Sequence, residues 1–316
     1  MTVCWVITED GLTGTENQCL GVADALGITP IVKRINLRQP WKTLSPWLGF
    51  ECACAFTGDE LAAPWPDLVI AAGRKAVAAA RTIKKQNPRT FVVFLQNPRI
   101  SSRHFDLVAA PAHDRLRGEN VIVTHAAPNR ITPARLSDAR QKFSALLEPL
   151  PVPRVAVLIG GSSKTHKMTP PVAERLATQL YTLAGQEFGL MVTTSRRTGE
   201  ENRKILLARL GRQPNIHIWD GHGENPYHGF LAWADYIIVT ADSASMLSEA
   251  ATTGKPVYMA ALEGGSARFD RLHNNLLDKG VIRNFKGKLE PYGYTPLNDA
   301  AMVAEEIHKR MKTGNK

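Results

Sequence analysis

The sequence lacks any apolar run near the roughly 20 residues that a membrane-spanning helix needs. Its first residues, MTVCWVITEDG, have no basic stretch before the apolar one and reach Glu9 early, so no secretory signal peptide is expected. Proline and glycine are not in excess, and no segment has low complexity, which argues against long disorder. These absences favour a globular cytoplasmic protein, either free or peripheral on the inner face of a membrane.

Cysteine is scarce. The four cysteines, Cys4, Cys19, Cys52 and Cys54, form no CxxC pair, and no histidine stands at zinc-ligand spacing. We therefore expect reduced thiols and no metal site.

Two nucleotide-binding fingerprints are also missing. No GxGxxG follows a strand, which argues against a nicotinamide dehydrogenase, and no GxxxxGK[ST] segment exists, which argues against a P-loop enzyme. Nothing in the sequence calls for a covalently bound cofactor.

Acidic residues are absent from one long basic segment. The net charge of the chain is +10, and the segment 74–103 has eight lysines and arginines but no acid. They are Arg74, Lys75, Arg81, Lys84, Lys85, Arg89, Arg99 and Arg103. Two interpretations stay open: a solvated helix face, or a surface for anionic lipid or a phosphorylated substrate. Basic and aromatic residues do not interleave there, so no nucleic-acid partner is expected.

An aromatic segment, PWKTLSPWLGF at 40–50, precedes these cations in the chain. Trp41, Trp47 and Phe50 either enter a lipid interface beside the cations or pack in the core. The sequence leaves the oligomeric state open.

Short β-branched runs alternate with helical stretches through almost the whole chain. This alternation predicts an α/β fold with two Rossmann-like, doubly wound domains facing a cleft. Three prolines, Pro149, Pro151 and Pro153, predict a linker between domains at 1–150 and 151–297. A terminal helix at 298–312 is expected to cross back to the first domain.

Ligands of such sheets bind where strands end and helices begin, because free N–H groups and the helix dipole attract phosphate there. The first such corner, TEDGLTGTENQ, has Gly11 and Gly14 for close backbone approach. Asp10 and Glu16 are its candidate catalytic bases. A plain capped turn is the alternative.

The second domain has two basic corners that suit a diphosphate. The first, GGSSKTH, offers Gly161, Ser162, Ser163 and Lys164; the second, TTSRRTGE, offers Ser195, Arg196 and Arg197. The alternatives are a flexible surface loop for the first and a solvated helix start for the second.

A third corner, ADSASMLSEAATTGKP, follows the apolar run YIIVT. Ser243 and Ser245 could cap a helix and present N–H groups to phosphate. Glu249 could accept hydrogen bonds from two ribose hydroxyls, or could be an ordinary helix acid.

Taken together, these segments resemble the mitochondrial fission family named for elongated mitochondria, which has many bacterial members. The resemblance covers nearly the whole chain and is carried by DGLTGTENQCLGVADALG, PDLVIAAGRKA, GGSSKTHKM, TTSRRT and NPYHGFLAWADYIIVTADSASMLSEAATTGKPVY. That family in turn is similar to GT-B glycosyltransferases, such as the N-acetylglucosaminyltransferase that makes the lipid-linked peptidoglycan precursor.

The resemblance implies roles for several residues. A nucleoside-diphosphate sugar would bind to the second domain, with its diphosphate at Ser243 and Ser245, its ribose at Glu249 and its base near Trp219 and Gly221. The loop from Gly11 to Gly14 would face the sugar. In glycosyltransferases this loop often ends in a histidine, but here it continues as Thr15-Glu16-Asn17-Gln18.

Three functions follow. A glycosyltransferase that acts on a membrane-associated or anionic acceptor would use Asp10, Glu16 or His104 as its base. Its leaving diphosphate would be stabilised by Lys164 and Arg197. A nucleoside-diphosphate-sugar epimerase on the same fold is one alternative. A non-catalytic, membrane-associated adaptor of the fission type is the other.

Overall fold

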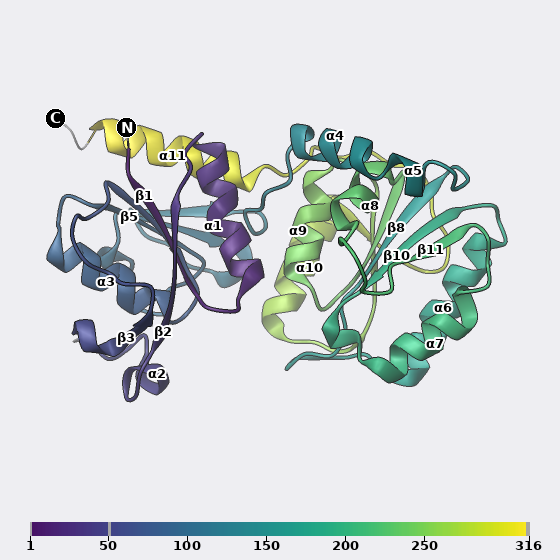
Figure 1. Ribbon diagram of the computed structural model, residues 1–316, viewed down its shortest axis with the longest axis horizontal. Coiled ribbons are helices and arrows are strands. Elements are labelled where there is room, and N and C mark those ends of the chain that lie inside the picture. The colour runs from purple at the N-terminus through teal and green to yellow at the C-terminus, as the bar shows by residue number, and fades with distance from the viewer. Residues whose placement is uncertain (1, 50–51, 314–316) are drawn as a thin grey trace. The chain divides into compact units, whose positions relative to one another are not determined.

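The protein forms two compact units, which we describe separately (Figure 1). The computed structural model describes residues 2–49 and 52–313. Unit 1 comprises Met1–Arg130 and Asn298–Lys316, and unit 2 comprises Ile131–Leu297. Among the described residues, no helix is both long and apolar enough to cross a bilayer.

Unit 1 is built on a seven-stranded sheet with the order β3-β2-β1-β4-β5-β6-β7. All neighbouring strands are parallel except β2 and β3. The strands are β1 (Cys4–Glu9), β2 (Ile31–Leu37), β3 (Phe56–Gly58), β4 (Leu68–Ala72), β5 (Phe91–Leu95), β6 (Leu107–Pro111) and β7 (Val121–Thr124). Strand β4 is buried at every position because helices cover both faces of the sheet.

The helices of unit 1 lie on opposite faces of this sheet. They are α1 (Thr13–Ala25), α2 (Trp41–Leu44), α3 (Ala76–Gln86) and α11 (Asp299–Thr313), with short 3₁₀ turns at Ala53–Ala55, Ser102–His104 and Ala112–Asp114. Alanine-rich α3 buries Val77, Ala80 and Ile83 against one face. Helices α1 and α11 lie side by side and bury Val22 and Ile307 against the other (Figure 1).

Unit 2 has a six-stranded parallel sheet with the order β11-β10-β8-β12-β13-β15. The strands are β8 (Arg154–Ile159), β10 (Gly189–Thr194), β11 (Ile216–Ile218), β12 (Tyr236–Thr240), β13 (Val257–Ala260) and β15 (Ile282–Asn284). A separate antiparallel ribbon pairs β9 (His166–Lys167) with β14 (Glu263–Gly264).

The helices of unit 2 are α4 (Pro133–Lys142), α5 (Ser144–Leu147), α6 (Pro170–Ala184), α7 (Glu200–Leu210), α8 (Tyr227–Trp233), α9 (Ala244–Thr252) and α10 (Ala267–Asp278), with a 3₁₀ turn at Arg196–Thr198. Pro170 opens α6, where its fixed φ suits the first turn. Helices α6 and α7 pack together, as do α4 and α8 (Figure 1).

The boundary between the units differs from the predicted one at 150–151. It lies at Arg130–Ile131, because α4 packs on α8. The Trp233 indole Nε1 donates to the Arg140 carbonyl at 2.9 Å, and the Arg140 guanidinium lies 4.1 Å from the centre of the indole ring. The three prolines therefore lie within unit 2. The terminal helix α11 belongs to unit 1.

The expectation of four reduced cysteines is corrected for one pair. Cys52 and Cys54 form a disulfide, and their Cα atoms lie 5.2 Å apart, within the range that a disulfide spans. Cys4 and Cys19 are free and buried, and burial raises the pKa of both thiols.

Candidate functional site

The sheet of unit 2 reverses its strand order between β8 and β12. From β8 the chain adds β10 and β11 on one side, and then β12, β13 and β15 on the other. In open parallel sheets, ligands bind outside the carboxyl ends of the strands at such a switch point. Two of the predicted corners, 160–164 and 241–245, follow β8 and β12 and therefore meet there.

Hydrogen bonds connect these two corners directly. The N–H of Gly160 donates to Thr240 Oγ1 at 2.8 Å, and the N–H of Gly161 donates to Asp242 Oδ2 at 3.0 Å. Thr240 in turn donates its hydroxyl to Asp242 Oδ1 at 2.7 Å. The loop after β8 is thus held to the end of β12 by buried contacts.

The arginine corner after β10 is bound to the same loop. Ser195 donates its hydroxyl to the Gly160 carbonyl at 2.8 Å, and the N–H of Ser162 donates to the Arg197 carbonyl at 2.9 Å. Ser195 also caps the 3₁₀ turn that carries Arg196 and Arg197. The three corners predicted for a diphosphate are therefore one connected structure.

Positions 160 and 161 both require glycine, because neighbouring atoms of the other corners lie too close for a Cβ atom. A Cβ on Gly160 would lie 2.3 Å from a carboxylate oxygen of Asp242. Gly161 has φ +153°, and a Cβ there would lie 2.1 Å from the Arg197 carbonyl oxygen. Neither position can accept a side chain without displacing a neighbouring corner.

Asp242 is the central residue that the sequence analysis missed. Its side chain is completely buried, and its Oδ2 lies 2.7 Å from Nη1 of Arg197. Together with Gly161 and Thr240, this gives the carboxylate three donors. The signal available in the sequence was an acid that follows the apolar run YIIVT after a single alanine.

The serines of the two loops mostly stabilise their own backbone. Ser162 Oγ accepts from the N–H of Met168, and Ser163 Oγ accepts from the N–H of His166, both at 3.1 Å. Ser243 Oγ caps α9 by accepting from Met246 at 3.3 Å. These bonds shape the loops, whereas the exposed Lys164 and the half-buried Ser245 lie at their surface.

Glu249, predicted to hold a ribose, is bound by a neighbouring helix. Its Oε2 accepts a hydrogen bond from the hydroxyl of Tyr227, the first residue of α8. Burial raises the pKa of Glu249 to about 7, although the Tyr227 hydrogen bond acts in the opposite direction. Burial also raises the pKa of Tyr227.

An open cavity of about 290 Å³ lies beside the arginine corner. Four predicted residues line it, namely Ser195, Arg196, Trp219 and Gly221, together with Arg203 and Asp220 among others. The Arg203 guanidinium donates to the Asp220 carbonyl at 2.6 Å and so fixes the loop after β11. The volume is near the lower end of the range for small-molecule sites, about 300–1,000 Å³.

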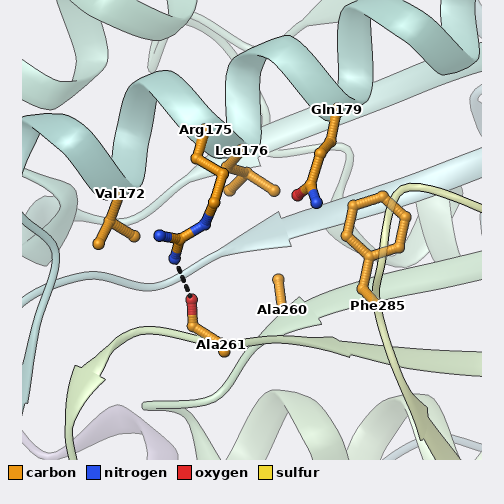
Figure 2. A pocket seen from close by; sticks show the side chains of 7 residues that line it. All are labelled: Val172, Arg175, Leu176, Gln179, Ala260, Ala261 and Phe285. Carbon is orange, nitrogen blue, oxygen red and sulfur yellow. Dashed lines mark hydrogen bonds between the residues drawn. The ribbon is translucent and has the colours of Figure 1, made fainter.

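A second cavity of about 50 Å³ lies between α6 and the end of β13 (Figure 2). Arg175 reaches across it to donate to the Ala261 carbonyl at 3.4 Å, while Phe285 closes its far side. It is too small for a nucleotide and contains none of the predicted site residues.

The glycine corner of unit 1 follows β1. Asp10 is exposed, Gly11 has φ +79°, and Gly14 lies in the first turn of α1. Glu16, however, is held by Arg34 through two hydrogen bonds of 2.8 Å. Both carboxylate oxygens of Glu16 therefore accept from Arg34, whereas Asp10 is exposed.

The third candidate base lies elsewhere. His104 is in the 3₁₀ turn that precedes β6, at the amino-terminal edge of the sheet. Asp10 follows the carboxyl end of β1, at the opposite edge. The structure therefore brings Asp10 and Glu16 together but not His104.

Several cations of segment 74–103 take part in contacts within unit 1. Lys75 pairs with Glu9 at 2.6 Å, and Lys84 pairs with Asp106 at 2.8 Å. Arg81 is buried. The segment is therefore not uniformly a solvated helix face. No group of three or more His, Cys, Asp or Glu side chains in the described part of the chain is placed to hold a metal ion.

A sequence profile of the family described as "Mitochondrial fission ELM1" matches residues 13–311. The chain belongs to the mitochondrial fission ELM1 family. Among its family relatives, Mitochondrial fission protein ELM1 of Arabidopsis thaliana is 27% identical, with 97% of this chain and 90% of that protein aligned. Uncharacterized protein RP120 of Rickettsia prowazekii (strain Madrid E) is 28% identical, with 98% of each aligned.

Solved structures show that this ELM1-family chain has the GT-B type of α/β fold with two Rossmann-like domains. One is UDP-GlcNAc 2-epimerase of Methanocaldococcus jannaschii in complex with UDP-GlcNAc and UDP. The match covers 98% of this chain and 100% of the epimerase chain, with a TM-score of 0.53 and 10% sequence identity. Another is MurG of Acinetobacter baumannii. The match covers 98% of this chain and 91% of the MurG chain, with a TM-score of 0.50 and 16% sequence identity. At these identities the likeness concerns the fold.

Proposed function

We propose that this ELM1-family protein binds a nucleoside-diphosphate sugar on unit 2 and transfers the sugar to an anionic or membrane-associated acceptor. The observation that carries the proposal is the hydrogen-bonded convergence of three corners at the switch point between β8 and β12. Loops that are rigid before the ligand arrives lose little entropy when it binds.

The diphosphate would lie at these corners. Lys164 and Arg196 are exposed cations, and Arg197 is still 42% exposed although it pairs with Asp242. Since Arg197 compensates the buried carboxylate, the corner does not repel an anion. Cations at a leaving diphosphate stabilise the charge that develops during sugar transfer.

The nucleoside would lie along the segment 219–227. Trp219 borders the larger cavity, and Tyr227, at the other end of the segment, donates its hydroxyl to Glu249. Oε1 of Glu249 is the carboxylate oxygen that Tyr227 does not occupy, and it would accept a ribose hydroxyl. Uridine nucleotides are the first to test, because UDP and UDP-GlcNAc were bound in the epimerase with the same fold.

Thermal denaturation with added ligand tests this proposal. A ligand at 100 times its Kd stabilises a protein by about 2.7 kcal/mol. We expect UDP and UDP-GlcNAc to raise the Tm of the wild type. In Glu249→Ala the Tm shift caused by these two ligands should be smaller, whereas the Tm shift caused by inorganic pyrophosphate should be the same as in the wild type. Glu174→Ala, an exposed change on α6, is the matched control. Equal losses for UDP and pyrophosphate in Glu249→Ala would contradict the ribose assignment.

One observation favours a second candidate, a non-catalytic adaptor that binds a nucleotide sugar. Of the three candidate bases, Glu16 is paired with Arg34 and His104 lies at the other edge of the sheet, which leaves Asp10. An assay of UDP release from UDP-GlcNAc, run with lipid-linked and with soluble acceptors, distinguishes the transferase from the adaptor. Turnover that Asp10→Asn abolishes, with UDP binding unchanged, supports the transferase; binding without turnover supports the adaptor.

A further inference from the structure

The segment 41–49 of unit 1 is held against α3 by cationic side chains. Arg74, Arg81 and Lys85 lie on one side of α3 and its start, since their spacing of seven and four residues repeats the helical turn. They donate to four main-chain carbonyls, those of Lys42, Ser45, Leu48 and Gly49, at 3.1, 2.6, 2.6 and 2.9 Å.

These bonds fix the segment without neutralising its charge, because a carbonyl oxygen carries no net charge. The segments 28–49 and 68–105 contain no aspartate or glutamate. Four exposed cations lie where the two segments meet, namely Arg38, Lys42, Arg74 and Lys85. None of the four is paired with a carboxylate within 2–49 and 52–313.

Large apolar side chains project from the same segment. Leu44 is 46% exposed and Trp47 is 63% exposed, whereas Ser45 and Pro46 between them are buried. The backbone of the segment 41–49 is therefore fixed while the side chains of Leu44 and Trp47 remain in solvent. A tryptophan and a leucine beside cations that have no carboxylate partner among the described residues are the combination that enters the interface of an anionic bilayer.

We propose that the α2–α3 surface, defined as Arg38, Lys42, Leu44, Trp47, Arg74 and Lys85, binds the surface of an anionic lipid bilayer. This goes beyond the nucleotide site of unit 2, which it does not require. A soluble phosphate would need donors that converge on it, and Arg74 and Lys85 already use part of their donor capacity on main-chain carbonyls. Their charge still attracts a negatively charged surface, since that attraction acts over about 10 Å without directed bonds.

Co-sedimentation with vesicles tests the proposal on the full chain. The vesicles are pure phosphatidylcholine or equal parts of phosphatidylcholine and phosphatidylserine. We expect the wild type to pellet with the mixed vesicles at low salt, to stay in the supernatant with pure phosphatidylcholine, and to dissociate as salt rises. Trp47→Ala should lower partitioning about tenfold, because a large apolar side chain is lost from the interface.

Matched control variants distinguish binding through this surface from nonspecific binding to vesicles. Val152 of unit 2 is also 63% exposed, so Val152→Ala should leave partitioning unchanged. Lys42→Glu should weaken binding strongly, whereas Lys204→Glu, the same charge change on the exposed side of α7, should have little effect. Circular dichroism of every variant establishes that it is folded.

Three results would overturn the proposal. The first is a wild type that stays in the supernatant with mixed vesicles at low salt. The second is equal partitioning of Trp47→Ala and Val152→Ala. The third is displacement by inorganic phosphate beyond the effect of sodium chloride at the same ionic strength, which would assign the surface to a soluble phosphorylated ligand.

Discussion

Nη1 of Arg197 lies 2.7 Å from Oδ2 of Asp242, and the pair spans the switch point of the unit 2 sheet. The aspartate side chain is completely buried, while the arginine side chain remains 42% exposed. The same carboxylate oxygen accepts the N–H of Gly161. One buried charge therefore orients both the glycine turn and the arginine that the proposed diphosphate would meet.

Removing the arginine should destabilise unit 2, because a buried carboxylate then loses its counter-charge. We expect Arg197→Ala to lower the free energy of unfolding by about 2 kcal/mol, less than for a fully buried pair, since Arg197 is partly solvated. The measurement is urea denaturation followed by circular dichroism. Arg196→Ala is the control, and as an exposed change it should stay within about 0.5 kcal/mol of the wild type. Equal midpoints for the two variants would show that Asp242 does not depend on Arg197.

The glycine turn gives a second prediction. Gly160→Ala would push a methyl group to 2.3 Å from the Asp242 carboxylate, so we expect a loss of about 1–3 kcal/mol in urea denaturation. Anion binding should weaken too, because the turn leads to Lys164 and because the Asp242 carboxylate that the methyl group would displace pairs with Arg197. Gly293→Ala, at a position with open space and no positive φ, is the matched control. If both variants unfold alike, the turn has room that the structure does not show.

How far the sequence predicts this site depends on which interactions are local. Buried parallel strands require continuous apolar runs, so YIIVT and RVAVLI and the corners after them were recognisable. Side-chain partners were not, because pairs such as Glu16 with Arg34 are set by the packing of α1 on the sheet. The domain boundary was missed for the same reason: Arg140 and Trp233 are 93 residues apart.

Glu249 should make stability depend on pH. Burial raises its pKa from 4.5 to about 7 in the folded protein. Between these values the folded state keeps a proton that the unfolded chain has released, so the stabilising contribution is full below pH 4.5 and is lost as the pH rises to about 7. In Glu249→Gln this dependence is absent, and the amide oxygen can still accept from Tyr227.

The measurement is the Tm of both proteins at intervals across that pH window. We expect the wild-type Tm minus the Glu249→Gln Tm to fall as the pH rises. Ribose binding should change in the opposite sense, because an ionised carboxylate accepts hydroxyl hydrogen bonds better than a protonated one. Tm curves that run parallel would show that Glu249 titrates with its ordinary pKa.

The boundary at Arg130–Ile131 predicts which fragments fold. A fragment of residues 131–297 retains α4 and α5 on α8, whereas a fragment of residues 151–297 uncovers Trp233, which is 7% exposed in the intact chain. It also uncovers Gly229, which lies so close to Phe143 that a Cβ would be 2.7 Å from that ring. Burial of one large side chain contributes about 1.5–3 kcal/mol, and a domain has only about 5–15 kcal/mol of stability.

We therefore expect the longer fragment to melt cooperatively in circular dichroism, and the shorter one to melt at a lower temperature or to aggregate. A synthetic peptide of residues 131–150 added to the shorter fragment should raise its Tm. The same peptide with Arg140→Ala should raise it less, since it lacks the guanidinium that stacks on Trp233. Identical melting of both fragments, without an effect of the peptide, would place the boundary at the prolines after all.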